Sequence, residues 1–383
     1  MRLAAYEDAV YHRDGDGLSA ERAFPLFLFG LAEEVDALTV LGRLDPAPGR
    51  SHYAMPGGAR FVALPWYASL GDVGAVLRAA PPTLRAVWRA LRDVEAIWVC
   101  GPGPVAVLVA LLAVARRRRV VLGVRQNTMA YARSRFPGRR GPLLAFRLME
   151  GAWRALARLA PVATVGPELH ALYAHAPRRH ELAVSFVRER DVAGPEVQAA
   201  REARAGGGVT VLSVGRLETE KNPLLLADVL AALVRGGGDW RLQVVGEGPL
   251  EAPLRARLAE LGVADRCELL GYVPLDGGLF DRYRAGDVLL HVSWTEGLPQ
   301  VLLEAFAARL PVVATEVGGV GPVARGAALL VAPGDAEAAA AAVRRLAGDA
   351  GLRHALAEEG VRRVRERTAE AERRKLVAFI RAA

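Results

Sequence analysis

Short apolar runs typical of buried strands alternate with helical patterns along the whole of this 383-residue chain. The first half carries such runs at 93–100, 119–124 and 161–165, with a helix predicted over 105–115. The second half carries clearer ones, at 209–214, 241–245, 267–270, 288–292 and 311–314. Because strands that alternate with helices build parallel sheets with crossover helices, the sequence predicts an α/β fold.

The length favours two domains, because a single hydrophobic core stops growing at about 250–300 residues. A polar, glycine-bearing stretch at 195–208 has no strand pattern and marks the break. We therefore expect an N-terminal domain over 1–195, a C-terminal domain over 209–361 and a charged helix over 362–383. Parallel sheets place their ligand crevices at the carboxyl ends of the strands, so the two crevices are expected to face each other across a cleft.

The charge balance favours an anionic partner. The 50 basic and 42 acidic residues give a net charge of +8, which suits an anionic ligand or an anionic membrane surface. Nucleic acid is not expected, because no stretch combines aromatic and basic residues. The two cysteines, Cys100 and Cys267, are far apart, which argues against a zinc site or a redox pair. The N-terminus lacks a signal-peptide pattern and the longest apolar run, 105–115, is too short to span a membrane, so we expect a cytoplasmic protein.

The segment 293–305, SWTEGLPQVLLEA, directly follows a predicted strand. Its Glu296 and Gly297 would lie on a short loop, and Pro299 stands where a helix would begin. Free N–H groups at a helix start attract phosphate or sugar hydroxyls, and glycine lets a ligand approach the backbone. Glu304 would lie roughly 7.5 Å further along the helix axis, within reach of a ribose diol, while Glu296 would face the sugar. The alternative is that both glutamates are solvated charges at a helix end.

The segment 213–223, SVGRLETEKNP, also leads from a strand into a loop and a helix. After Gly215, the arginine fork of Arg216 and the point charge of Lys221 flank the loop and suit a diphosphate. The alternative is a surface charge pair, because the same loop contains Glu218 and Glu220.

Five motifs occur in a specific order and spacing: VGRLETEKNP, VVGEGPL, LLGYVP, AGDVLLHVSWTEGLPQVLLEAFA and PVVATEVGG. With them, residues 209–345 resemble the C-terminal domain of the family-4 retaining glycosyltransferases, also called glycosyl transferases group 1. The resemblance implies the GT-B fold, in which two Rossmann-like domains face each other across a cleft. It also implies that the C-terminal helix packs back onto the N-terminal domain.

The resemblance further implies a donor site. Arg216 and Lys221 would hold the diphosphate, Glu296 would contact the donor sugar and Glu304 the ribose. The implied donor-binding residues are Gly215, Arg216, Lys221, Glu296, Gly297, Leu298, Pro299 and Glu304, and the implied catalytic residues are Glu296, Arg216 and Lys221. The reaction would move a sugar from a UDP- or GDP-sugar to a glycan, lipid-linked or small-molecule acceptor, with retention of configuration. No metal or other cofactor is implied, and the diphosphate itself would take the proton of the acceptor.

The N-terminal half carries weaker signals. Gly15 and Gly17, in the sequence DGDG, are expected in the first strand–helix loop, before a helix entering at Ser19, where they would let the chain approach the donor or acceptor. The Asp–x–Asp within DGDG is a metal-binding pattern of a different glycosyltransferase fold, and here a glycine-rich turn is the simpler reading. Arg125 stands where many relatives carry a histidine, so a role of that histidine does not carry over.

A run of arginines at 116–119, together with Arg139, Arg140 and Arg147, has two interpretations. It forms either a solvated helix end or a basic face toward anionic lipid at the inner side of a membrane.

Three other activities fit the fold less well. They are a sugar-nucleotide epimerase, a pyridoxal-dependent phosphorylase, which would need a longer chain, and a non-catalytic nucleotide-sugar binder.

Overall fold

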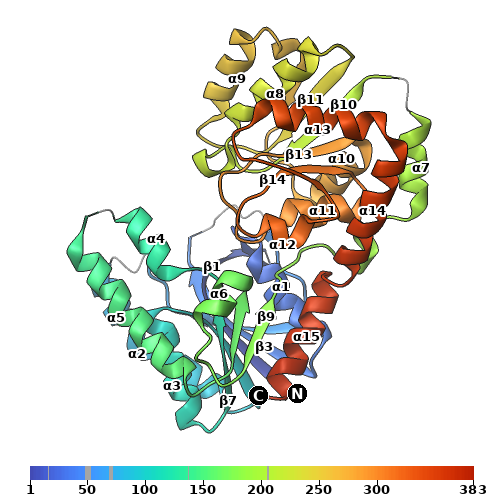
Figure 1. The fold of residues 1–383 in the computed structure, drawn as a ribbon. Coiled ribbons are helices and arrows are strands. Elements are labelled where there is room, and N and C mark those ends of the chain that lie inside the picture. The colour runs from blue at the N-terminus through green and yellow to red at the C-terminus, as the bar shows by residue number, and fades with distance from the viewer. Residues whose placement is uncertain (16, 48–52, 69–71, 137, 205–206) are drawn as a thin grey trace. The chain divides into compact units, whose positions relative to one another are not determined.

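The computed structural model describes residues 1–15, 17–47, 53–68, 72–136, 138–204 and 207–383. The chain forms two compact units, one of Met1–Val184 with Glu370–Ala383 and one of Ser185–Ala369 (Figure 1). Each unit has a sheet whose strands alternate with helices along the chain, so the predicted α/β fold is confirmed. Among the described residues, no helix is long and apolar enough to cross a membrane.

The first unit contains a largely parallel sheet. Its central strand β1 (Arg2–Asp14) pairs in parallel with β3 (Ala37–Asp45) and with β6 (Ala96–Gly101), placing Leu3 opposite both Leu38 and Ala96. The parallel strands follow the order β5 (Ala59–Leu64), β3 (Ala37–Asp45), β1, β6 (Ala96–Gly101), β7 (Arg119–Val124), β8 (Val162–Val165) and β9 (Arg179–Leu182).

The predicted first strand–helix loop is wrong, because the chain after β1 forms a second strand instead of a helix. β2 (Gly17–Ala20) returns antiparallel to the end of β1, with Asp14 opposite Gly17, and it also pairs with β4 (Tyr53–Ala54). Ser19 is therefore a strand residue, and the first helix, α1, spans Phe24–Gly30. Gly15 has φ +58°, a backbone conformation that tight turns require and that glycine adopts freely. Asp16 lies outside the described residues.

Helices on one side of this sheet bury an apolar core between themselves and the strands. They are α2 (Val73–Ala90), α3 (Pro104–Ala115) and α5 (Arg140–Ala157), which contribute Val87, Val109 and Trp153 to that core. In Figure 1 they lie together with α4 (Thr128–Arg135), while α1 and the last helix, α15 (Ala369–Arg381), lie on the other side of the strands. A short helix, α6 (Pro167–Leu172), follows β8.

The second unit has a six-stranded parallel sheet with a reversal in its strand order. The order is β12 (Cys267–Leu269), β11 (Trp240–Val245), β10 (Val209–Val214), β13 (Val288–His291), β14 (Val312–Thr315) and β15 (Leu329–Val331). From β10 the chain proceeds outward to β12, and from β13 it proceeds outward in the other direction. The loops after β10 and β13 therefore diverge at a topological switch point, the place where open α/β sheets bind ligands.

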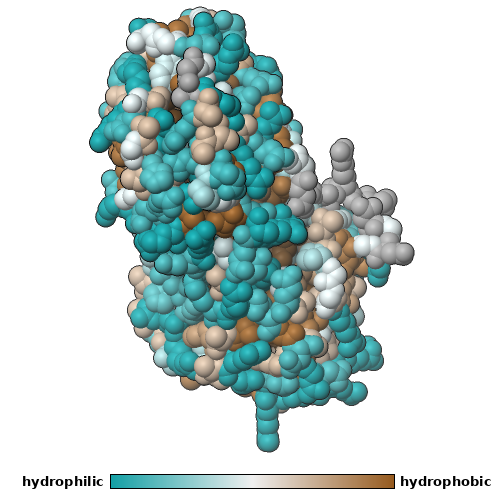
Figure 2. Space-filling model, turned by 90° about the vertical axis from the view of Figure 1, so that its right-hand side faces the viewer, coloured by the Kyte–Doolittle hydropathy of each residue, from teal (hydrophilic) through white to brown (hydrophobic). Residues whose placement is uncertain are grey.

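Helices cover both faces of the second sheet and fill two apolar cores. On one face lie α8 (Leu224–Arg235), α9 (Glu251–Glu260) and α13 (Ala336–Gly348). On the other lie α10 (Phe280–Ala285), α11 (Gln300–Ala307) and α12 (Val320–Ala324). α14 (Ala350–Arg365) contributes Leu356 to the first core and Val364 to the second. Hydrophilic side chains cover most of the surface seen in Figure 2, with smaller hydrophobic patches between them.

The units change at residues 184 and 185, ahead of the break expected at 195–208. Part of that stretch is a helix, α7 (Pro195–Ala203), rather than a linker. α7 belongs to the second unit because its buried Arg201 donates hydrogen bonds to the carbonyl oxygens of Gly286, at 2.7 Å, and Arg309, at 2.8 Å. Such contacts join residues distant in sequence, so composition alone did not reveal them.

The last helix begins later than the sequence suggested. Residue 362 lies within α14, and the final helix, α15, spans Ala369–Arg381. Most of α15 belongs to the first unit, where Glu372 accepts a hydrogen bond from the backbone N–H of Ala183 and Arg373 pairs with Glu33.

Candidate functional site

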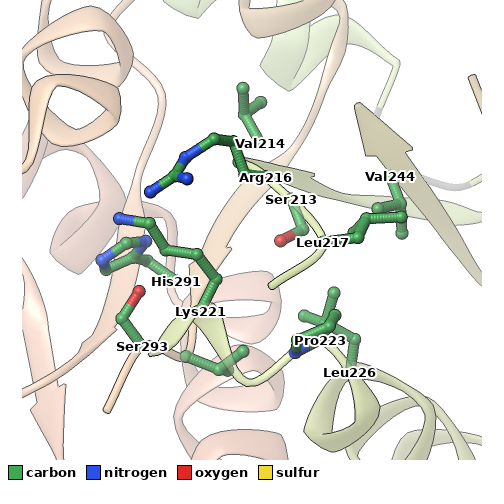
Figure 3. A pocket seen from close by; sticks show the side chains of 12 residues that line it. Ser213, Val214, Arg216, Leu217, Lys221, Pro223, Leu226, Val244, His291 and Ser293 are labelled. Carbon is green, nitrogen blue, oxygen red and sulfur yellow. The ribbon is translucent and has the colours of Figure 1, made fainter. Parts of the chain in front are cut away.

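The loops that follow β10 and β13 meet around a small pocket in the second unit. Side chains from the end of each strand and from the loop after it line the pocket, among them Ser213, Arg216, Lys221, His291 and Ser293. Figure 3 shows the amino group of Lys221 lying beside the imidazole of His291, with the Ser293 hydroxyl below them. The predicted residues Gly215, Arg216 and Lys221 therefore line one pocket at the switch point.

Glu296 is held by three groups of this cluster. Its Oε1 accepts hydrogen bonds from Lys221 Nζ and from Ser293 Oγ, each at 2.7 Å. His291 Nε2 lies 3.0 Å from the same oxygen, although its N–H is not aligned for a hydrogen bond. Burial raises the pKa of Glu296, but the contacts with His291 and Lys221 outweigh burial and lower that pKa to about 2. Glu296 is therefore ionised at neutral pH, and its carboxylate fixes the position of the Lys221 ammonium group.

His291 and Ser293 are site residues that the sequence reasoning missed. Both are buried. They occur in the run VLLHVS, in which a polar residue interrupts an otherwise apolar strand just before its carboxyl end. A buried polar side chain needs a partner, so such an interruption is a usable signal for a site at the strand end.

Arg216 makes a different set of contacts from Lys221. Its guanidinium donates to Glu218 Oε2 at 2.5 Å and to Glu220 Oε1 at 2.9 Å, and its side chain is 63% exposed. The charge pairing with Glu218 and Glu220, considered above as an alternative, is thus present. It occupies the guanidinium edge that a diphosphate would use, so a ligand would have to displace these carboxylates or bind beside them.

Two glycines of the PVVATEVGG motif shape the loop that carries Glu296. A Cβ atom added to Gly319 would lie 1.7 Å from the carbonyl oxygen of Gly297, and one on Gly318 would lie 2.1 Å from that of Glu296. The N–H of Gly319 also donates to the carbonyl oxygen of Glu296 at 2.9 Å. Only glycine permits this approach of two backbones. The PVVATEVGG motif therefore packs directly against the loop that carries Glu296.

Pro299 was predicted to be the first residue of the helix, but in the structure it precedes the helix. It is the N-cap of α11, with φ −75° and ψ 95°, and the helix begins at Gln300. Leu298 and Gly297 form the loop before it, and an added Cβ on Gly297 would meet open space.

Glu304 is not part of the Lys221–Glu296 cluster or of the pocket lining. It lies on α11, buried in the apolar core, and accepts a 2.6 Å hydrogen bond from the hydroxyl of Tyr283 on α10. Burial raises the pKa of Glu304, and the hydrogen bond from Tyr283 opposes part of this shift. Its contact with a ribose stays a prediction. Tyr283 was missed, and no motif in the sequence points to it.

Arg125 lies at the carboxyl end of β7 in the first unit and pairs with a buried glutamate. Its guanidinium contacts Glu7 on β1 and lies 3.7 Å from the ring centroid of Phe24. Burial raises the pKa of Glu7, and the Arg125 charge opposes that shift. Next to it, Asp8 Oδ1 accepts from Arg43 Nε at 2.6 Å and from Tyr67 Oη at 2.8 Å.

The acidic pair Glu7–Asp8 was also missed in the sequence. Its signal is two adjacent carboxylates within the otherwise apolar strand RLAAYEDAVYH. The pairing register of β1 with β3 shifts between Tyr6 and Val10, so the regular ladder is interrupted in the stretch that contains Glu7 and Asp8. Gly15 and Gly17 lie in the hairpin beyond it, and their contact with a ligand stays a prediction. Within the described parts of both units, no group of three or more His, Cys, Asp or Glu side chains could hold a metal ion.

Comparison with known proteins finds a family match within the second unit. Residues 196–363 match the family described as "Glycosyl transferases group 1". The 2-deoxystreptamine glucosyltransferase of Streptomyces kanamyceticus is 37% identical over 147 residues, which cover 37% of this chain and 37% of that protein. The amylovoran biosynthesis glycosyltransferase AmsK of Erwinia amylovora is 33% identical over 145 residues, covering 36% of this chain and 35% of that protein. The matched segments thus span little more than a third of these relatives.

Solved structures resemble the whole chain. Sucrose-phosphate synthase from Thermosynechococcus elongatus has a TM-score of 0.71 and 18% identity, with 100% of this chain and 98% of that one covered. HepE of Anabaena in complex with UDP has a TM-score of 0.72 and 16% identity, with both chains covered completely, at 100%. At these identities the likeness establishes the fold. Residues 196–363 thus match the glycosyl transferases group 1 family, and the chain has the GT-B fold.

Proposed function

We propose that this protein is a glycosyltransferase that moves a sugar from a UDP- or GDP-sugar to an acceptor, with retention of configuration and without a divalent metal. The observation that carries the proposal is the contact of Lys221 with ionised Glu296 at the switch point of the second sheet. The match of residues 196–363 to the glycosyl transferases group 1 family supports it, as does the UDP bound to the structurally similar HepE.

Lys221 supplies positive charge where a donor diphosphate would leave. Its ammonium group keeps two further donor positions while one N–H is held by Glu296. A fixed cation needs little reorganisation when negative charge develops on the leaving group, so it lowers the barrier electrostatically. Arg216 adds a second cation once its pairing with Glu218 and Glu220 is exchanged for phosphate oxygens. These two cations take the place that a divalent metal occupies in other phosphate sites.

Glu296 has two roles in this proposal. One carboxylate oxygen positions Lys221, and the carboxylate charge also faces the donor sugar, which becomes positive as its bond to the diphosphate breaks. Gly215, Gly297, Leu298 and Pro299 form the surrounding backbone, and Glu304 takes the ribose hydroxyls while Tyr283 holds its other oxygen. The departing diphosphate accepts the proton of the acceptor hydroxyl, on the face from which the acceptor attacks.

The acceptor is a glycan, a lipid-linked sugar or a small molecule, and Arg125 with Gly15 and Gly17 is its contact region in the first unit. The names of the relatives, a 2-deoxystreptamine glucosyltransferase and an amylovoran biosynthesis glycosyltransferase, support glycan or natural-product biosynthesis. We place the enzyme in the cytoplasm, peripheral to the inner face of the membrane.

A donor screen tests the proposal. Thermal unfolding of the protein would be followed with UDP, GDP and their hexose conjugates, and the stabilising donor would then be supplied with candidate acceptors in the presence of EDTA. We expect one nucleotide to stabilise the protein and sugar transfer to persist in EDTA, with the product anomer, read by NMR, matching the donor. Loss of transfer in EDTA or an inverted anomer would contradict the mechanism. An isomerised donor formed without acceptor would indicate an epimerase.

A further inference from the structure

The outer side of α3 and α5 in the first unit exposes large aliphatic side chains. Leu108, Leu111 and Val114 on α3 and Leu144 and Leu148 on α5 are between 39% and 68% exposed. We call the surface formed by these five residues the α3–α5 face. The two helices pack against each other and lie side by side in Figure 1, so the five side chains belong to one surface.

α3 is apolar on all sides. Its sequence, PVAVLVALLAVA, contains no polar side chain. The side with Val105, Val109 and Ala113 packs on the sheet, and the opposite side carries Leu108 and Leu111 at helical spacing. A helix at a water-exposed surface normally has a polar outer face, whereas one that is apolar all round is covered on both sides. At 12 residues, α3 is too short to span a bilayer, so its outer side requires a cover at the surface.

α5 repeats this arrangement and adds charge. Trp153 and Ala157 point into the core, while Leu144 and Leu148 lie four residues apart on the exposed side. Arg140 and Arg147 on the same helix and Arg158 at its end are exposed as well. Leucines with neighbouring arginines are the composition of helices that lie in the plane of a membrane interface.

The segment that contains both helices is strongly positive, which favours an anionic partner for the α3–α5 face. Residues 73–158 contain sixteen arginines and three acidic residues, whereas the whole chain has a net charge of only +8, so the remainder is net negative. One of the three acids, Glu150, is buried and bound to Arg154 and Tyr173. Arg116 lies 3.8 Å from the ring centroid of the half-exposed Trp88, and tryptophan is enriched at membrane interfaces. A strongly positive apolar surface is complementary to anionic lipid.

We propose that the α3–α5 face docks on an anionic lipid bilayer, with its leucines in the boundary between headgroups and acyl chains and the arginines against lipid phosphates. This inference deepens the proposed peripheral location of the enzyme and rests on it. It would bring the first unit, which the proposed function assigns to the acceptor, to the surface where lipid-linked acceptors reside.

Vesicle sedimentation of the full chain tests the proposal. The probes are vesicles of phosphatidylcholine alone and of phosphatidylcholine with phosphatidylglycerol. We expect binding only to the anionic vesicles, with release by salt because screening weakens charge attraction. Leu111→Glu with Leu148→Glu should lower the partition coefficient by about tenfold or more, because carboxylates resist entry into the boundary region. The triple change of Arg140, Arg147 and Arg158 to Ala should also lower it by about tenfold or more.

A charge-matched control removes three exposed arginines from the second unit, by changing Arg235, Arg255 and Arg362 to Ala. It alters the net charge equally and should leave vesicle binding within about twofold of wild type, because only arginines near the surface contribute. Equal losses in the two triple variants, or no binding of the wild type to anionic vesicles at low salt, would overturn the proposal. Conversion of a dimer to a monomer by the leucine changes, with vesicle binding unchanged, would assign the face to a subunit interface and overturn it too.

Nucleotide binding separates this inference from the proposed function. Calorimetry with UDP and GDP should give the same affinity for the face variants as for wild type, and thermal unfolding verifies that they fold. A wild type that binds a nucleotide but does not bind anionic vesicles refutes the docking surface alone. A wild type that binds vesicles but neither nucleotide refutes the donor site and leaves the surface standing.

Discussion

Lys221 Nζ lies 2.7 Å from Glu296 Oε1, although 75 residues separate them in the chain. The contact joins the loop after β10 to the loop after β13, and Ser293 and His291 contact the same carboxylate oxygen. It makes the two motifs a single site, so changes in either residue should alter the other's position.

Removing the Lys221 charge should weaken diphosphate binding. Lys221→Ala loses a charge-assisted contact worth roughly 1.5–3 kcal/mol, which is about a tenfold to hundredfold loss of UDP or GDP affinity. The parent nucleoside should bind as before, because it has no phosphate. Calorimetry measures both. Lys375, the only other lysine in the sequence, supplies the matched control, and Lys375→Ala in the first unit should leave both affinities unchanged.

The stability contribution of Glu296 should depend on pH. Because the pKa of Glu296 is lowered to about 2 in the folded protein, its ionised form stabilises the fold above the unfolded pKa near 4.5. That contribution, on the order of 3 kcal/mol at neutral pH, is lost as the pH falls from about 4.5 toward 2. Glu296→Gln should therefore lower the melting temperature at pH 7 and have less than about half that effect near pH 3. An equal difference at both pH values would contradict the assignment.

Tyr283 should stabilise the folded protein through its hydrogen bond to Glu304. Tyr283→Phe removes the only side-chain hydrogen bond seen for the Glu304 carboxyl in the described structure, and an unpaired buried polar group costs roughly 1–3 kcal/mol. Urea unfolding measures this loss. If Glu304 also holds the ribose, the variant should bind the nucleoside more weakly. The same loss of nucleoside affinity in Glu304→Gln, with no further loss in the double variant, is the expected pattern, because the two residues act together.

Glu218 and Glu220 should oppose phosphate binding. Changing both to Gln releases the Arg216 guanidinium and removes two negative charges from the loop, so UDP or GDP should bind more tightly, by several-fold. The same pair of changes in an Arg216→Ala background should have a smaller effect, since no guanidinium is left to release. If the gain in affinity is the same in both backgrounds, the carboxylates act by long-range repulsion instead of by occupying Arg216.

The contact between Gly319 and Gly297 should be sensitive to a single methyl group. Gly319→Ala places a Cβ atom 1.7 Å from the Gly297 carbonyl oxygen, so the Glu296 loop must move and donor turnover should fall. Gly348→Ala, at the end of α13 with open space around it, is the matched control and should retain turnover. Steady-state kinetics with the stabilising donor measures both variants.

Much of the second unit could be predicted from sequence. The predicted strand 209–214 is β10 with the same bounds, and 119–124 in the first unit is β7. Strands buried on both faces of a parallel sheet are continuous apolar runs bounded by polar or glycine residues, so composition marks them. The antiparallel pairing of β2 with β1 and helix α7 were not predicted, because each depends on pairing or packing with other residues of the chain.

The sequence by itself determined the fold class and the chemical character of the candidate site, because the motifs contain the charged residues and glycines that follow the strands. Tertiary structure alone decided which charges are paired. Lys221 pairs with Glu296 from the loop after another strand, and Glu304 meets Tyr283 in the core, whereas the pairing of Arg216 with Glu218 and Glu220 is local in the chain. Hydrogen bonds require their partners within about 3 Å, and only the folded chain brings residues from different strands and helices to that distance.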